Sequence, residues 1–299
     1  MIKVESITKK FGDYTALENF SLTIHEGHIY GIVGYNGAGK TTLMKTIAGI
    51  YRPERGSITM DDVKIYENER IKGTFFMVQD EPLFFPQATL TSMEGFYKGY
   101  YPGWNDSVFK KLIELFGLNP KGRINGFSKG MQRQASIILG LATMPQYLLL
   151  DESFDGLDLA KRNLLKALLF AYLKANATNI LISSHNLKEL EGICDHIAII
   201  KDKELSFGDS VEHMRQERRK FHVILPDEHE KQEFYKMGFK NVEGSYKTYT
   251  FISKTTEEET RTVLQPLSPT SFQSIALTLE EIFLDEMEEF EYDFNGFFS

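Results

Sequence analysis

The sequence predicts an α/β fold built around a mostly parallel sheet, and two kinds of apolar pattern predict it. Short apolar runs that resemble buried strands occur at 28–33, 147–150, 179–183 and 197–200. Between these runs, apolar residues recur at helical spacing at 41–50, 160–175 and 187–193. Strands that are apolar throughout and alternate with helices are typical of a parallel sheet covered on both faces.

The remaining segments predict additions to this core. Alternation of apolar and polar residues over 2–33 indicates short strands, which we assign to an antiparallel β subdomain. An irregular helical pattern over about 81–145 indicates an inserted α-helical subdomain. We therefore expect one large domain over 1–208, followed by a charged linker over 209–220.

Residues 221–299 read as a small C-terminal α/β domain. Its last helix carries a capping-box signal, Thr278 with Glu281. The same helix is predicted to have an apolar stripe formed by Leu279, Ile282, Phe283, Met287 and Phe290. The acidic residues around this helix are typical of a solvated face and tail.

Charge and composition exclude several classes of function. The 299 residues include 34 basic and 42 acidic side chains, a net charge of −8, which disfavours nucleic acid as a partner. The single cysteine excludes a disulfide framework and fits a reducing cytosol. No apolar run approaches the ~18 residues of a membrane span. We expect a soluble, cytoplasmic chain.

The segment 34–42 carries the strongest functional signal. It reads Gly-Tyr-Asn-Gly-Ala-Gly-Lys-Thr-Thr and matches the pattern G-x-x-x-x-G-K-[ST] between a predicted strand and a predicted helix. Glycines let backbone N–H groups curl around phosphate oxygens, and the helix N-terminus adds positive potential. Lys40 is placed to reach the β- and γ-phosphates, and the Thr41 hydroxyl to hold Mg²⁺. A glycine turn with an exposed lysine is the plain structural alternative. The pattern predicts a P-loop that binds a nucleoside triphosphate.

Two carboxylates end the apolar run at 147–150. Asp151 is placed to bind Mg²⁺, and the neighbouring Glu152 to act as a general base toward water. Charged residues at strand ends are common, so this pair alone is weak evidence for a functional site. The phosphate loop that precedes it strengthens the functional interpretation.

The order of motifs resembles that of the ATP-binding cassette (ABC) family over roughly residues 2–208. Residues 34–42 resemble the Walker A loop and 148–152 the Walker B strand, while 127–132 (Phe-Ser-Lys-Gly-Met-Gln) resemble the signature motif. Gln79 stands at the position of the Q-loop glutamine, 154–158 resemble the D-loop, and His185 resembles the switch histidine. The fold that this implies is a P-loop NTPase core with the subdomains described above, and 1–208 is then the nucleotide-binding domain.

The resemblance implies a role for each motif residue. Adenine would stack on Phe11, and the triphosphate would bind the loop made of Gly34, Tyr35, Asn36, Gly37, Ala38, Gly39, Lys40, Thr41 and Thr42. Catalysis would rest on Glu152, His185 and Gln79, and Mg²⁺ would bind Thr41, Gln79 and Asp151. The D-loop would contribute Asp158. The residues expected to contact the ATP of a partner cassette are Ser128, Lys129, Gly130 and Met131. Core packing for Phe11, a turn amide for Gln79 and a strand-end role for His185 are the simpler alternatives.

The signature motif departs from the usual Leu-Ser-Gly-Gly-Gln. Phe127, Lys129 and Met131 are replacements, whereas Ser128 and Gly130 are kept. The form Ser-Lys-Gly-Met resembles a variant found in bacterial exporter-type cassettes, a branch that includes peptide and antibiotic exporters. It also leaves open whether the working pair of cassettes is a homodimer or a heterodimer with a paralogue.

The resemblance also implies partners and location. A separate transmembrane permease would supply the transport path, and the chain would sit peripherally on the inner, cytoplasmic face of the cell membrane. The aromatic-rich segment 82–101 is expected to receive a short permease helix, although half of its aromatics fit the subdomain's own core equally well. The docking candidates are Leu83, Phe84, Phe85, Phe96, Tyr97, Tyr100 and Tyr101.

Two other classes of function compete with an exporter ATPase. A soluble ABC ATPase in translation would resemble proteins with two cassettes, and one in DNA repair would carry a long insertion, yet Ser128 follows Lys40 by only 88 residues. A GTPase or small-molecule kinase is the second class, but the chain has no Asn-Lys-x-Asp guanine motif.

Overall fold

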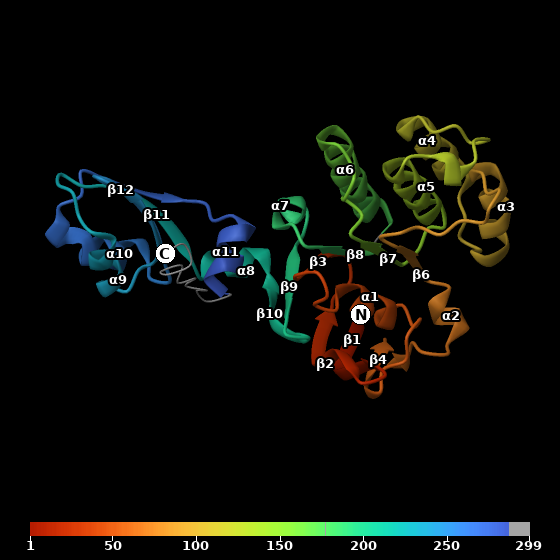
Figure 1. Ribbon diagram of the computed structural model, residues 1–299, viewed down its shortest axis with the longest axis horizontal. Coiled ribbons are helices and arrows are strands. Elements are labelled where there is room, and N and C mark those ends of the chain that lie inside the picture. Colours follow the sequence, from red (N-terminus) through yellow and green to blue (C-terminus); the bar gives the residue numbers. More distant parts are fainter. Residues whose placement is uncertain (177, 287–299) are drawn as a thin grey trace, which may run out of the picture. The chain divides into compact units, whose positions relative to one another are not determined.

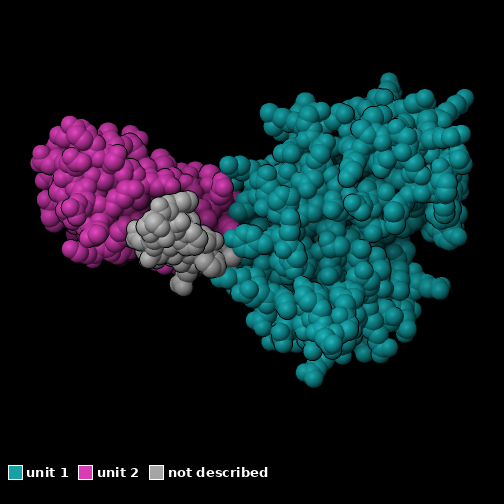
Figure 2. Space-filling model, viewed as in Figure 1, with its two compact units in different colours: residues 1–208 teal, residues 209–299 magenta. Residues whose placement is uncertain are grey.

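The computed structural model describes residues 1–176 and 178–286 of the chain. These residues form two compact units, unit 1 (Met1–Gly208) and unit 2 (from Asp209 onward), which Figure 2 colours separately. Two residues of the predicted last-helix stripe, Met287 and Phe290, lie outside the described residues. Among the helices that are described, none has the length and apolar character that crossing a membrane requires.

The first sheet of unit 1 is antiparallel. Its strand order is β2-β1-β4-β5 (Figure 1). The strands are β1 (Ile2–Phe11), β2 (Tyr14–Ile24), β4 (Arg55–Met60) and β5 (Val63–Lys64). The alternation in the sequence follows from this arrangement, because Ile2, Val4 and Ile7 of β1 are buried in a shared core.

The second sheet of unit 1 has the order β10-β9-β3-β8-β7-β6. Its strands are β3 (Ile29–Val33), β6 (Phe75–Val78), β7 (Tyr147–Asp151), β8 (Asn179–Ser184), β9 (His196–Lys201) and β10 (Glu204–Ser210). The pairs from β6 through β7, β8 and β3 to β9 are parallel. Every residue of β3, β7 and β8 is buried, which explains their continuous apolar runs.

Helices cover both faces of this sheet. Figure 1 shows α1 (Lys40–Ile47) on one face and α6 (Leu159–Asn176) on the other. The helical region lies beside α6 and contains α3 (Leu90–Tyr100), α4 (Asp106–Phe116) and α5 (Lys129–Ala142). The shorter helices of unit 1 are α2 (Glu69–Lys72), η1 (Ile124–Gly126) and α7 (Leu187–Leu190).

Unit 2 is built on an antiparallel sheet with the order β12-β13-β11-β14. Its strands are β11 (Arg219–Ile224), β12 (Lys240–Ser245), β13 (Thr248–Ser253) and β14 (Ser271–Ile275). Its helices are α8 (Val211–Gln216), α9 (Lys231–Lys236), α10 (Glu257–Leu264), η2 (Gln265–Leu267) and α11 (Leu279–Glu286). An aromatic core holds it together, in which Phe251 stacks on Phe239 with ring centroids 4.2 Å apart.

The segment 209–220 differs from the linker that the sequence predicts. It forms α8 and the start of β11. The hydroxyl of Ser210 accepts a hydrogen bond from the backbone N–H of His213 at 3.1 Å and caps the helix. Val211 and Met214 are buried, so the charged residues of α8 form the outer face of a short helix rather than a solvated connection.

Candidate nucleotide site

The loop between β3 and α1 has the form that the P-loop pattern predicts. Gly37 and Gly39 have φ angles of +82° and +110°. A side chain at Gly39 would also place its Cβ 2.6 Å from the carbonyl oxygen of Ala16, so only glycine fits there. Lys40 opens α1 and is 5% exposed. Its Nζ donates to the carbonyl oxygen of Gly34 at 2.8 Å and to that of Tyr35 at 3.3 Å.

Asp151 ends β7 beside this loop. Its Oδ2 accepts a hydrogen bond from the Thr41 hydroxyl at 2.7 Å, and its Oδ1 accepts one from the Ser183 hydroxyl at 2.5 Å. Burial raises the pKa of Asp151 above its usual range, while these two hydrogen bonds act in the opposite direction. The carboxylate and the hydroxyl of Thr41 are hard oxygen donors at one point, which fits Mg²⁺.

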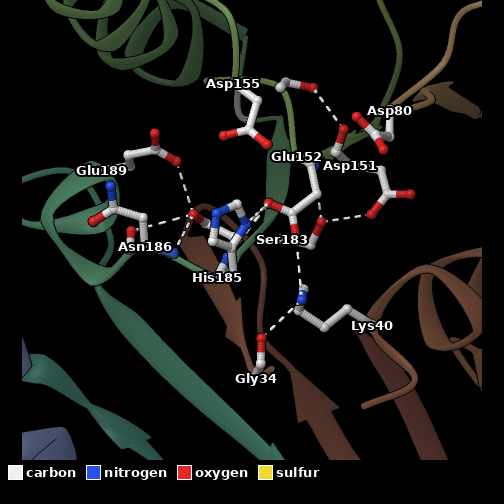
Figure 3. A network of polar contacts seen from close by, with 12 residues as sticks. Gly34, Lys40, Asp80, Asp151, Glu152, Asp155, Ser183, His185, Asn186 and Glu189 are labelled. Carbon is white, nitrogen blue, oxygen red and sulfur yellow. Dashed lines mark hydrogen bonds and ion pairs between the residues drawn. The ribbon is translucent and has the colours of Figure 1, made fainter. Parts of the chain in front are cut away.

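Glu152 lies between a lysine and a histidine (Figure 3). Its Oε1 is 3.0 Å from Lys40 Nζ, and its Oε2 is 2.9 Å from His185 Nδ1. The backbone of Glu152 has a φ of +45° and is held by a hydrogen bond from its N–H to the Ser183 hydroxyl at 3.0 Å. Only 10% of the Glu152 side chain is exposed, so its carboxylate is held by Lys40 and His185 rather than by water.

A cavity of about 280 Å³ adjoins these groups. Aromatic side chains line one part of it, because Phe11 and Tyr14 both border the cavity and are about half exposed. An exposed ring can stack on a base. The other lining residues are Ala16, Asn36, Gly37, Gly39, Lys40, Thr41, Thr42, Asp80 and Glu152.

Some predicted site residues do not line this cavity. Among the described residues, these are Gly34, Tyr35, Ala38, Gln79, Asp151, Asp158, His185 and the signature residues. Ser128 is instead the N-cap of α5, where its hydroxyl accepts a hydrogen bond from the N–H of Met131 at 3.3 Å. Asp158 plays the same part at α6, accepting from the N–H of Lys161 at 2.9 Å.

Sequence reasoning did not identify three residues of this site. Tyr14 and Asp80 border the cavity, and Ser183 holds both Asp151 and the backbone of Glu152. Asp80 directly follows Gln79, and Ser183 ends the run before His185, so both stood next to residues that the motifs did indicate.

The fold and this site define a P-loop nucleotide-binding protein, because a glycine loop between a strand and a helix cradles a buried lysine beside strand-end carboxylates. A family model described as "ABC transporter" matches residues 17–155. The chain belongs to the ATP-binding proteins of ABC transporters, and it binds and hydrolyses ATP.

Three relatives support this family assignment, and one solved structure has the same fold. The transporter ATP-binding protein NatA of Bacillus subtilis is 31% identical over 73% of this chain and 93% of its own length. YtrB of the same organism is 26% identical over 95% of this chain and 97% of its own length. The bacitracin transport ATP-binding protein BcrA of Bacillus licheniformis is 29% identical, covering 74% of this chain and 73% of its own. The solved structure of an ATP-binding subunit of an ABC transporter has a TM-score of 0.66 at 24% identity, over 72% of this chain and 92% of that one, and shows the same fold.

Proposed function

We propose that the chain is the ATPase subunit of an exporter and that its catalytic base is Glu152. The observation that carries the catalytic part of the proposal is the position of the Glu152 carboxylate, which lies 3.0 Å from Lys40 Nζ and 2.9 Å from His185 Nδ1. A triphosphate that binds at Lys40 competes with Glu152 for the ammonium group. One carboxylate oxygen is thereby freed to accept the proton of an attacking water, while His185 holds the other.

The remaining roles follow from the same geometry. The base stacks on Phe11, and the loop N–H groups with Lys40 bind the β- and γ-phosphates. Thr41 and Asp151 would hold Mg²⁺ with help from Gln79, and the bound ion would neutralise developing charge on the phosphates. Gln79 follows β6 directly and precedes Asp80, which borders the cavity.

The signature residues support a head-to-tail dimer. Ser128 caps α5 and Gly130 lies in its first turn, where the helix N-terminus adds positive potential. These groups do not border the chain's own cavity, so we propose that they contact the γ-phosphate of a second cassette. ATP then neutralises two basic surfaces and closes the dimer, and hydrolysis opens it again.

We place a separate permease on the aromatic segment. Leu83, Phe85, Phe96 and Tyr100 are 40% to 85% exposed, and the ring of Phe96 contacts those of Phe85 and Tyr100. The inner aromatics pack against the sheet, since Tyr101 donates a hydrogen bond to the carbonyl oxygen of Phe75 at 3.2 Å. An exposed aromatic row of this kind fits an apolar permease helix. We infer from this docking that the chain works on the inner face of the cell membrane.

Export is supported by the variant signature and by the names of relatives such as BcrA. A peptide, antibiotic or other amphipathic molecule is the class of cargo that we infer.

The test of the catalytic and dimer proposals is the Glu152→Gln chain. A carboxamide cannot take the proton of water, so phosphate release should fall by at least about 100-fold while ATP binding is kept. Size-exclusion chromatography should show a monomer without nucleotide and a dimer with Mg-ATP.

Two arginine variants complete the experiment. Adding Ser128→Arg to the Glu152→Gln chain should block the dimer but leave ATP binding intact. The control is Ser107→Arg, at an exposed serine near the start of α4, which should leave both the dimer and ATP binding intact. A Glu152→Gln chain that stays monomeric at high protein and ATP concentrations would rule out the homodimer and indicate a paralogous partner. A dimer that forms equally well without nucleotide would contradict the gating by ATP.

The permease surface is tested in membranes that hold the whole transporter. Phe85→Asp and Tyr100→Asp should release the chain from the permease and leave its own ATPase activity intact. Leu115→Asp, an equally exposed apolar position on α4, is the matched control and should stay bound. Release by all three variants, or by none, would contradict docking at the aromatic row.

A further inference from the structure

Arg133 is a buried cation of α5 that the roles above do not use. It stands one turn after the signature residues and is 7% exposed. A guanidinium group at that depth requires charged or polar partners, because burial without them costs several kcal/mol. Its partners come from two segments that lie far from it in the sequence.

The first partner is Asp80, which borders the nucleotide cavity. Arg133 Nη2 is 2.6 Å from Asp80 Oδ1 and donates to the carbonyl oxygen of Asp80 at 2.7 Å. One nitrogen therefore fixes both the side chain and the backbone of the residue that follows Gln79. Asp80 borders the same cavity as Lys40, so its charge lies near the place where a triphosphate binds.

The second partner is the D-loop. Arg133 Nη1 donates to the carbonyl oxygen of Asp155, whose side chain lies within 4.8 Å of ligand atoms of Glu152 and His185. Gly130 adds a close backbone contact, because a Cβ there would lie 2.9 Å from the carbonyl oxygen of Gly156. The first turns of α5, the D-loop and Asp80 are thus held together around one guanidinium group.

We infer that Arg133 is a positioning residue with two effects on ATP. It neutralises Asp80, so that the phosphates of the chain's own ATP do not meet an unpaired carboxylate. It also ties this cavity to α5 and the D-loop, which makes the signature residues respond to the ATP bound in the same chain. The second effect rests on the proposed head-to-tail dimer, in which those residues serve the partner's ATP. Lysine cannot replace the arginine, because the contacts need a planar group with several N–H donors.

The test uses the full-length chain and separates the two effects. Arg133→Gln should weaken ATP binding by about 10-fold, measured by titration with ATP, because Asp80 is left unpaired in the cavity. Adding Asp80→Asn should restore most of that affinity, since it removes the carboxylate itself. Restoration by a second substitution distinguishes the charge effect from simple damage to the fold. Arg123→Gln, an exposed arginine before η1, is the matched control and should bind ATP normally.

The coupling is measured as dimer formation in the Glu152→Gln background at saturating Mg-ATP. Arg133→Gln should raise the protein concentration needed for the dimer by at least about 10-fold, and Asp80→Asn should not restore it, because the bond to Asp155 is still missing. Should Arg133→Gln fail to fold, Asp80→Asn alone and Arg133→Lys carry the test, with an affinity gain expected from the first and weaker dimerisation from the second.

The outcomes distinguish this inference from the proposed function. If Glu152→Gln itself forms no ATP-dependent homodimer, the proposed homodimer fails and the coupling role of Arg133 in it fails as well. If that chain dimerises, and the Arg133→Gln variant binds ATP and dimerises equally well, the inference alone is overturned.

Discussion

Both units have an apolar core, but they differ in how they bury charged side chains. In unit 1, Lys40, Asp151 and Glu152 are between 1% and 8% exposed and lie together at one edge of the parallel sheet. In unit 2, the largest buried side chains are aromatic, and Arg218 and Asp285 form a buried ion pair at 2.8 Å.

The difference separates function from stability. Aromatic packing stabilises a fold and needs no further reason. Buried charges are at best weak contributors to stability, so a cluster of them indicates a ligand that uses them. The buried charges of unit 1 therefore indicate a functional site, whereas the buried aromatic side chains of unit 2 indicate what stabilises its fold.

The largest effect should come from the aromatic core of unit 2. Phe251 is fully buried against Phe221, Phe234 and Phe239, so Phe251→Ala should cost about 3–5 kcal/mol of unit 2 stability. Calorimetry should show this loss while ATP still raises the melting temperature of unit 1. Tyr246→Ala, an exposed aromatic of the same unit, should change little. Loss of ATP binding in the Phe251→Ala chain would contradict the assignment of function to unit 1 and of structural stability alone to the core of unit 2.

The next effect concerns the gain in stability from ATP. At about a hundredfold excess over Kd, Mg-ATP should stabilise the wild-type chain by about 2.7 kcal/mol. Lys40→Ala removes the charge that binds the β- and γ-phosphates, so this gain should vanish in a thermal melt. Lys231→Ala, an exposed lysine of unit 2, should keep it. An unchanged gain in Lys40→Ala would contradict the assignment of the site.

A smaller effect, a gain in thermal stability on substitution, is expected at Asp151. Its raised pKa means that the ionised carboxylate costs stability in the folded state, chiefly through burial. Asp151→Asn should therefore raise the melting temperature by roughly 2 °C at pH 7 and abolish ATP hydrolysis. Because protonation removes the cost in the wild type, the difference should shrink as the pH falls through the raised pKa toward 3.8, the ordinary value of this carboxyl group. A variant less stable than the wild type at pH 7 would show that the hydrogen bonds from Thr41 and Ser183 dominate instead.

The smallest effect should come from Glu281 of unit 2. Burial alone would raise its pKa, but hydrogen bonds from Lys220 and Thr278 lower it. A lowered pKa means stability that is present above the unfolded pKa and lost as the pH falls through the folded value. Glu281→Gln should therefore cost about 0.5 kcal/mol at pH 7 and less near pH 4, measured by urea unfolding. Glu228→Gln, an exposed glutamate of the same unit, is the control. A pH-independent difference would show that the charge plays no part.

Local patterns account for what the sequence predicted. Lys40 and Glu152 each belong to a short motif at the end of a strand, and parallel strands bring their carboxyl ends to one edge, so the two motifs had to meet. The bond between Arg133 and Asp80 joins residues 53 positions apart through one side-chain conformation, which no local pattern encodes. The structure differs from the predicted linker at 209–220 for a similar reason. The helix α8 buries only Val211 and Met214 and is too short for its periodicity to be recognised.

The left-handed backbone of Glu152, with its φ of +45°, has a consequence for attempts to engineer this chain. A non-glycine residue in that conformation carries a cost that glycine would not. Glycine at 152 would relieve that cost, but it would also leave the buried Lys40 without its carboxylate partner, which costs more, and the chain would no longer split ATP. Libraries built on this scaffold should hold residue 152 fixed and place their diversity in unit 2.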